Sequence, residues 1–237
     1  MVSQACRGVY EETKKAAHDN DFTLVLGGDH SIAIGSIAGL LSERYPDLAV
    51  IWFDAHADIN TLQTTVSGKL HGCPVSFLLR VEGNEEYPFD WLKQSKGWLT
   101  ADRIGYIGLR DVEDAEQEIL DELNIYHAPM KMIRHVGSVE ECAKQLLKAI
   151  DPESKRPLHL SFDVDGIDPL FTPSTGTPVT GGLTLEEAVK IVKMIKDTGR
   201  LVSMDIVEVN TKLGKAPGDA EKTIASTLAV LDVVVNK

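Results

Sequence analysis

Apolar runs of strand length alternate along this chain with segments whose apolar residues recur at helical spacing. Runs of about four to eight mostly apolar residues are typical of strands buried in a sheet. They lie at residues 22–26, 48–53, 104–109, 158–162 and 201–206, and residues 124–130 have room for a further short strand.

The segments between these runs predict helices, because their apolar residues fall on one face. We expect helices at residues 3–19, 31–40, 74–79, 114–123, 139–150, 184–197 and 218–235. Thr184 and Glu187 form a capping box at the start of one of them. Ser31 is expected to cap the helix that runs to Leu40. Residues 81–100 are predicted to be irregular.

Strands that alternate with helices form right-handed βαβ units, in which the strands run parallel. We therefore predict an α/β fold of three layers, α/β/α, with helices on both faces of a mostly parallel sheet. The 237 residues contain no internal repeat, low-complexity tract or linker, so residues 1–237 are expected to form one domain.

Composition narrows the possible partners. The net charge of −12 argues against binding to nucleic acid, which requires a basic surface, but it would attract a cationic substrate. No apolar run approaches the length of a membrane span, so no membrane contact is expected, and the first residues lack the pattern of a secretion signal. Cys6, Cys73 and Cys142 form no metal-binding pair and are expected to be reduced thiols of a cytoplasmic protein.

Polar residues cluster just after the predicted strands. In chain order these are Asp29 and His30, then Asp54, His56 and Asp58, then Asp163 and Asp165, and finally Glu208. Residues two apart in an extended segment point to the same side. The carboxyl ends of parallel strands meet at one edge of the sheet, where ligands bind. We therefore expect these clusters to converge on one site.

The pooled side chains indicate a metal centre. Carboxylates buried together repel one another unless cations lie between them. The set is too acidic for a single zinc ion, which prefers histidine and cysteine ligands. It suits two divalent ions a few ångströms apart, which can hold a hydroxide as a nucleophile. Oxygen-rich ligation with two imidazoles favours manganese.

Each cluster taken alone also fits an ordinary role. An Asp-x-His-x-Asp sequence occurs in solvated loops, and a Gly-Asp pair occurs in turns. Residues 163–166 fit a turn or a weak calcium loop, although they lack the spacing of an EF-hand. His71 is either a proton shuttle or a surface histidine. Glu208 either binds a cationic group or ends its strand in solvent. Three such clusters at three strand ends favour the metal site.

The sequences around these residues resemble the signatures of a known enzyme family. Residues 27–31, 54–60 and 161–169 are similar to the three signatures of the ureohydrolases. The arginase branch in particular is indicated by Ser67-Gly68, His71-Gly72, Gly176-Thr177-Pro178 and Gly181-Gly182. The resemblance implies an arginase-like fold and a cytoplasmic enzyme with two Mn²⁺ ions per subunit. The implied reaction is the hydrolysis of L-arginine to L-ornithine and urea.

The resemblance also implies a role for each site residue. One ion would be bound by His30, Asp54, Asp58 and Asp163, and the other by Asp54, His56, Asp163 and Asp165. A hydroxide that bridges the ions would attack the guanidinium carbon. The catalytic residues would be Asp58, which passes the proton to the leaving amine, His71, which exchanges protons with water, and Glu208, which pairs with the guanidinium. The rest of the substrate would be bound by Asn60, Ser67 and Glu116, and Asp29 would orient a metal ligand.

The chain departs from the arginase pattern in two substrate contacts and at both ends. Lys69 stands where the family usually has asparagine, and Glu113 stands where it usually has aspartate, so recognition of the amino-acid end is affected more than the metal site. The family usually has two further strands before Gly27, so the resemblance implies an N-terminally truncated domain with an exposed sheet edge. An organellar targeting signal would lie in that segment. A C-terminal tail that helps arginases form trimers is largely absent, although a homo-oligomer, by resemblance a trimer, is expected.

Other functions also fit parts of the pattern. A ureohydrolase for another guanidino compound, such as agmatine, would use the same metal site. Binuclear metallophosphoesterases share the Asp-x-His sequence, but they require an Asn-His ligand pair that this chain lacks. The third alternative is an inactive, truncated arginase-like subunit that only binds a partner.

Overall fold

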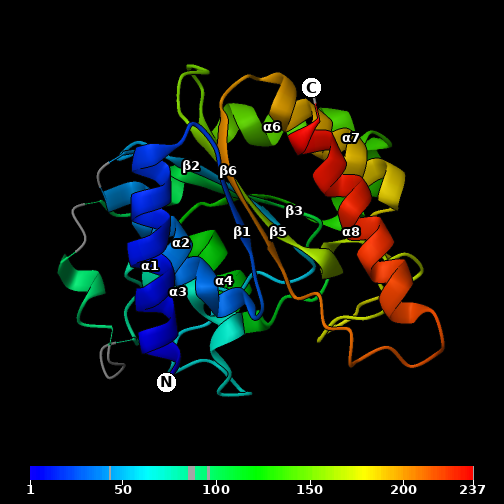
Figure 1. Cartoon of the computed structure of the whole chain (residues 1–237), viewed down its shortest axis with the longest axis horizontal. Coiled ribbons are helices and arrows are strands. Elements are labelled where there is room, and N and C mark those ends of the chain that lie inside the picture. The colour runs from blue at the N-terminus through cyan, green and yellow to red at the C-terminus, as the bar shows by residue number, and fades with distance from the viewer. Residues whose placement is uncertain (43, 85–88, 95–96, 237) are drawn as a thin grey trace.

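The computed structural model describes residues 1–42, 44–84, 89–94 and 97–236 (Figure 1). Within these residues one six-stranded sheet has the order β1-β6-β5-β2-β3-β4, and neighbouring strands all pair in parallel. The strands are β1 (Thr23–Leu26), β2 (Ala49–Phe53), β3 (Ile104–Ile107), β4 (Tyr126–Ala128), β5 (Leu158–Asp163) and β6 (Leu201–Val207). The predicted parallel sheet is therefore confirmed.

Helices cover both faces of this sheet, as the α/β/α prediction requires. They are α1 (Val2–Asp19), α2 (Ala33–Ser42), α3 (Pro74–Leu79), α4 (Asp114–Glu122), α5 (Met130–Val136), α6 (Val139–Ile150), α7 (Leu185–Asp197) and α8 (Asp219–Val235). Figure 1 shows α1, α2 and α3 on one side of the sheet and α7 and α8 on the other. In the described part of the chain, no helix has the length and apolar character needed to cross a membrane.

The core is divided by the sheet into two clusters. β2 lies in the middle of the sheet, and all five of its residues are buried. Trp52 contributes to the cluster under α1 to α4, whereas Ile51 and Phe53 contribute to the cluster under α5 to α8. A strand that is covered on both faces is apolar throughout rather than alternating. This is why residues 48–53 appear in the sequence as one continuous apolar run.

Three local predictions are wrong. The short helix α5 is not among the predicted elements, because only Met130 and Ile133 of its seven residues are buried and the pattern is too short to recognise. Asp29, and not Ser31, caps the turn at His30–Ile32, since its Oδ1 accepts a hydrogen bond from the Ser31 amide (3.0 Å). β3 ends two residues earlier than predicted, because Gly108 adopts φ 107°, outside the strand region.

The backbones of α1 and α2 approach each other closely at Gly35. A Cβ atom there would lie 2.2 Å from the carbonyl oxygen of Cys6 and 3.0 Å from the amide nitrogen of Tyr10. These contacts involve backbone atoms, which cannot move aside without shifting the helix. Gly8, also in α1, has no atom within 4 Å of an added Cβ and serves as a matched control.

We expect Gly35→Ala to lower the free energy of unfolding by about 2 kcal/mol, because the added methyl group forces the two helices apart. Gly8→Ala should raise it by about 0.5–1 kcal/mol, because alanine favours the helix and nothing obstructs it. Urea denaturation of both variants measures the difference. Equal effects of the two substitutions would contradict the close packing of α1 on α2.

Candidate metal centre

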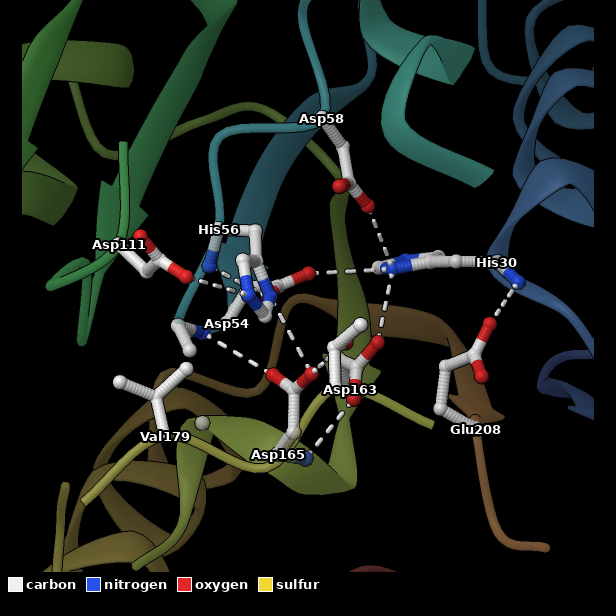
Figure 2. Close-up of polar contacts among 12 residues, drawn as sticks. His30, Asp54, His56, Asp58, Asp111, Asp163, Asp165, Val179 and Glu208 are labelled. Atoms are coloured by element: carbon white, nitrogen blue, oxygen red, sulfur yellow. Dashed lines mark hydrogen bonds and ion pairs between the residues drawn. The ribbon is translucent and has the colours of Figure 1, made fainter. Parts of the chain in front are cut away.

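The predicted site residues converge at the carboxyl ends of four adjacent strands (Figure 2). His30 lies in the 3₁₀ turn after β1, Asp54 follows β2, Asp163 ends β5 and Glu208 follows β6. These strands are neighbours in the order β1-β6-β5-β2, although their residues are far apart in the sequence. The sheet order therefore brings the polar clusters into one place.

His30 is surrounded by carboxylates. Its Nδ1 lies 3.1 Å from Asp54 Oδ2, 3.1 Å from Asp58 Oδ2 and 3.2 Å from Asp163 Oδ2. The side chain is 1% exposed, yet Nδ1 makes no hydrogen bond to any described residue. A buried polar atom without a partner is costly. A cation between the imidazole and the three carboxylates would satisfy all four groups, so the donor set fits a metal ion.

A second group shares one residue with the first. His56 Nδ1 lies 3.4 Å from Asp54 Oδ1 and 3.2 Å from Asp165 Oδ2. The ligand atoms of His30, Asp54 and Asp163 lie within 4.8 Å of one another, and so do those of Asp54, His56 and Asp165. Because Asp54 belongs to both groups, its two oxygens can contact two ions at once. The geometry therefore fits a pair of ions rather than a single one.

Backbone and side-chain donors fix the carboxylates in these orientations. The indole nitrogen of Trp52 donates to Asp54 Oδ2 (3.0 Å), and the amide of His56 donates to Asp54 Oδ1 (2.7 Å). The Asp165 amide donates to Asp163 Oδ1 (2.8 Å), and the Thr177 hydroxyl donates to Asp165 Oδ2 (3.0 Å). Ligands held in this way do not have to be ordered when an ion binds.

The close grouping of buried carboxyl groups shifts their pKa values. Burial, followed by the charge of Asp54, raises the pKa of Asp58 to about 8. Burial and the neighbouring charges of Asp165 and Asp54 raise the pKa of Asp163 well above its usual value. Burial opposes protonation of His56, but its contacts with Asp165 and Asp54 outweigh this and raise its pKa to about 12. These shifts have one cause, which is that acids buried this close together are unfavourable in their charged form unless positive charge lies beside them.

The residues predicted to act in catalysis border a pocket above these groups. Glu208 Oε1 accepts a hydrogen bond from the His30 amide (2.8 Å), and its side chain is 13% exposed. His71 Nδ1 lies 3.9 Å from Glu208 Oε1 and 3.7 Å from Asp29 Oδ2. Asp29 therefore lies beside His71 while it caps the turn that holds His30. Asp58 borders the same pocket.

The residues predicted to bind the rest of the substrate, Asn60, Ser67 and Glu116, lie around the same pocket, and so do Lys69 and Glu113, which depart from the family pattern. The side-chain nitrogen Nδ2 of Asn60 donates to Glu113 Oε2 (3.3 Å). Glu116 is 4% exposed, and its two oxygens accept hydrogen bonds from the amides of Ile59 (3.1 Å) and Glu113 (3.1 Å). Its carboxylate thus positions the loops that carry Asn60 and Glu113. Contact with a substrate stays a prediction for all five residues.

Two supporting residues were not predicted from the sequence. Ser161 Oγ lies 2.9 Å from His30 Nε2, the ring nitrogen that faces away from the carboxylates. Asp111 Oδ2 lies 3.6 Å from His56 Nε2 (Figure 2). A second polar contact of this kind fixes the orientation of a metal-binding imidazole. Ser161 precedes Asp163 by two residues on the same strand face, so alternation alone could have indicated it.

Comparison with known proteins identifies relatives of the chain. The family model described as "Arginase family" matches residues 1–233. The chain is 47% identical over 232 residues to Arginase-1 of Homo sapiens, covering 97% of this chain and 70% of that protein. It is 46% identical over 214 residues to the arginase of Eremothecium gossypii, covering 90% of this chain but 52% of the relative. The chain thus spans about half the length of the latter protein.

Solved structures of arginases have a similar fold. The arginase from Bacillus caldovelox superposes with a TM-score of 0.88 at 31% identity, covering 100% of this chain and 76% of that one. The arginase of Entamoeba histolytica, solved in complex with L-ornithine, gives a TM-score of 0.87 at 30% identity, covering 100% of this chain and 77% of that one.

We expect added Mn²⁺ to stabilise the protein, because ions bind the folded site and have no comparable site in the unfolded chain. At a concentration 100 times the dissociation constant, the gain per ion is about 2.7 kcal/mol. Asp163→Asn should lose most of this gain, whereas Asp121→Asn, on the surface of α4, should retain it. Thermal unfolding with and without a chelator measures the effect. Equal stabilisation of both variants would contradict the assignment of Asp163 as a ligand.

Proposed function

This chain belongs to the arginase family, and we propose that it is a manganese-dependent hydrolase that converts L-arginine and water to L-ornithine and urea. The observation that carries the proposal is the pair of ligand groups that share Asp54, beside a pocket lined by His30, His56 and Glu208. The relatives described above are arginases, which supports the same activity.

The donor set supports manganese as the metal. We assign one ion to His30, Asp54, Asp58 and Asp163, and the other to Asp54, His56, Asp163 and Asp165. The set is rich in oxygen, contains two imidazoles and has no thiolate, which favours manganese over zinc. When bound, the ions would supply Lewis acidity and make a water molecule nucleophilic near neutral pH.

Glu208 is suited to bind the guanidinium group. Its carboxylate is mostly buried at the pocket wall, and the His30 amide holds one of its oxygens. The other oxygen is available for charge-assisted hydrogen bonds with the substrate, which are stronger than neutral ones. Glu208 has φ 64°, an unfavourable conformation for a residue other than glycine. Strain of this kind is found at functional sites, where the surrounding structure imposes it.

Asp58 and His71 are suited to move the proton. Hydrolysis adds water to the guanidinium carbon and breaks the bond to the ornithine nitrogen, which must receive a proton as it leaves. Asp58 is 7% exposed and borders the pocket, where its carboxylate can take a proton from the attacking water and deliver it. His71 is 26% exposed, and it can exchange protons between the pocket and solvent.

The rim of the pocket complements an amino acid. Lys69 offers a cation for the α-carboxylate, and Glu113 offers an anion for the α-ammonium group. These charges match the zwitterionic end of L-arginine, whereas agmatine lacks the carboxylate. The substitutions of Lys69 and Glu113 for the usual family residues are thus compatible with arginine as the substrate.

The resemblance also leads us to propose a cytoplasmic homo-oligomer, with a trimer as the expected form. The three cysteines are free and buried, which accords with a reducing compartment.

We expect the Mn²⁺-loaded protein to release urea from L-arginine. His71→Asn should lower kcat about 10²-fold without changing the manganese content, because it removes a proton-transfer group rather than a ligand. His18→Asn, in the last turn of α1, is the matched control and should leave kcat unchanged. A colorimetric urea assay measures both variants. A protein that binds two ions but releases no urea would support an inactive subunit instead.

We expect Lys69→Met to raise KM for L-arginine by about twofold to fivefold, the range for loss of an exposed ion pair. KM for agmatine should be unchanged, because agmatine has no carboxylate. Lys131→Met, on the exposed side of α5, is the matched control. Initial rates with both substrates measure the effect. An equal change for both substrates would contradict the proposed carboxylate contact, and faster turnover of agmatine would identify an agmatinase.

A further inference from the structure

Arg110 lies beside the proposed metal ligands but does not line the pocket. Its guanidinium group donates hydrogen bonds to five backbone carbonyl oxygens. Nε and Nη2 donate to Val179 (3.1 and 2.7 Å). Nη1 donates to Gly108 and Gly166 (3.2 Å each). Nη2 also donates to Asp165 (2.6 Å) and Ile167 (3.3 Å). Among the described residues, every hydrogen bond of this side chain goes to the backbone.

These carbonyl groups belong to three segments that surround the second ion site. Residues 165–167 form the turn after β5, and this turn carries the Asp165 carboxylate. Val179 follows Thr177, whose hydroxyl holds Asp165 Oδ2. Gly108 follows β3. One planar group therefore ties together the turn that presents a proposed ligand and the loop that orients it. A lysine, with a single nitrogen, cannot span five acceptors in this way.

The backbone of the same residue completes the arrangement. The Arg110 amide donates to the carbonyl of Ala55 (2.8 Å), and the Ala55 amide donates to Asp165 Oδ1 (3.2 Å). The next residue, Asp111, places its carboxylate 3.6 Å from His56 Nε2. Both residues that distinguish the second ion site, His56 and Asp165, are therefore supported by residues 110–111.

Gly182 leaves the space that the guanidinium group occupies. A Cβ atom at this position would lie 2.7 Å from Arg110 Nη2 and 2.7 Å from the backbone nitrogen of Asp168. Arginine remains protonated in proteins, so the group also places a fixed positive charge beside a strongly acidic site. Burial lowers the pKa of Arg110, and the charges of Asp165 and Asp54 oppose this.

We propose that Arg110 is a positioning residue that sets the affinity of the ion bound by His56 and Asp165, without contact with the substrate. The inference rests on the proposed metal centre. Loss of an outer contact to a metal ligand weakens binding about 10-fold to 100-fold. Because Arg110 holds the backbone of Asp165 and not its carboxylate, we expect the lower end of this range, about 10-fold, for Arg110→Lys.

The test is a titration of the metal-free protein with Mn²⁺ alone. Calorimetry and electron paramagnetic resonance measure how much Mn²⁺ binds and with what affinity. Each ion site is isolated by removing the other. In a His30→Asn background, where the second site remains, Arg110→Lys should weaken binding about 10-fold. In a His56→Asn background, where the first site remains, it should change binding less than about twofold. A purely structural role would weaken both sites equally and would overturn the proposal.

Arg103→Lys is the matched control. Arg103 is also a partly buried arginine that donates to carbonyl groups, those of Pro46 and Trp98, but it lies at the opposite end of β3. It should leave both affinities unchanged. If Arg110→Lys does not fold, Gly182→Ala is the second variant. Its methyl group crowds the guanidinium group, whose charge is retained, and the adjoining Asp168 backbone, and it should produce the same selective loss.

The outcomes separate this inference from the proposed function. Wild-type protein that binds two ions, with affinities that Arg110→Lys and Gly182→Ala leave unchanged, would overturn the role of Arg110 alone. Wild-type protein that binds fewer than two ions would overturn the metal centre and the role of Arg110 with it.

Discussion

The burial of four aspartates at one point is the constraint on which this structure depends. Asp54, Asp58, Asp163 and Asp165 are between 0% and 7% exposed and lie around two imidazoles. Placing a charge in such an environment costs several kcal/mol unless a partner compensates it. The histidines alone cannot do so, and the His30 nitrogen that faces the carboxylates has no hydrogen-bond partner among the described residues. The site is thus built for cations that the protein itself does not supply.

Several features of the fold serve this constraint. Parallel pairing places the ends of β1, β6, β5 and β2 side by side, so that ligands from distant parts of the chain meet. The Trp52 indole and the Thr177 hydroxyl donate to the same Asp54 and Asp165 oxygens that face the imidazoles, and so fix their positions. Asp58 and Glu208 adopt positive φ values, which the packed surroundings hold in place. Arg110 places a positive charge next to Asp165 without lining the pocket.

The acidic pocket also accounts for the proposed substrate. A guanidinium group carries a positive charge that Glu208 can pair with, and the remaining acids attract cations to the pocket. We propose that recognition of the amino-acid end depends on two more exposed side chains, Lys69 and Glu113. In the proposed function, the tightly held part of the site carries out the reaction, and the exposed rim selects which guanidino compound enters.

Much of the fold could be predicted from the sequence, because buried strands and amphipathic helices leave periodic patterns. All six strands and seven of the eight α-helices in the described residues lie where those patterns predict. The short helix α5 could not be predicted, since two buried residues do not form a recognisable pattern. The cap at Asp29 and the end of β3 at Gly108 depend on backbone dihedral angles, which the pattern does not specify.

The candidate site, like the fold, could be predicted from the sequence only in part. The sequence by itself determined which residues can bind metal, because Asp54, His56 and Asp58, or Asp163 and Asp165, lie two apart at strand ends, where alternation turns them to one side. Only the tertiary structure decided that Asp54 faces both His30 and His56, and that Ser161, Asp111 and Arg110 support them. The contacts of Ser161, Asp111 and Arg110 join residues separated by 50 or more positions in the sequence. Asp54 is closer in sequence to the two histidines, but His30 lies after another strand of the sheet. The order and register of the strands, rather than any local pattern, bring these distant residues together.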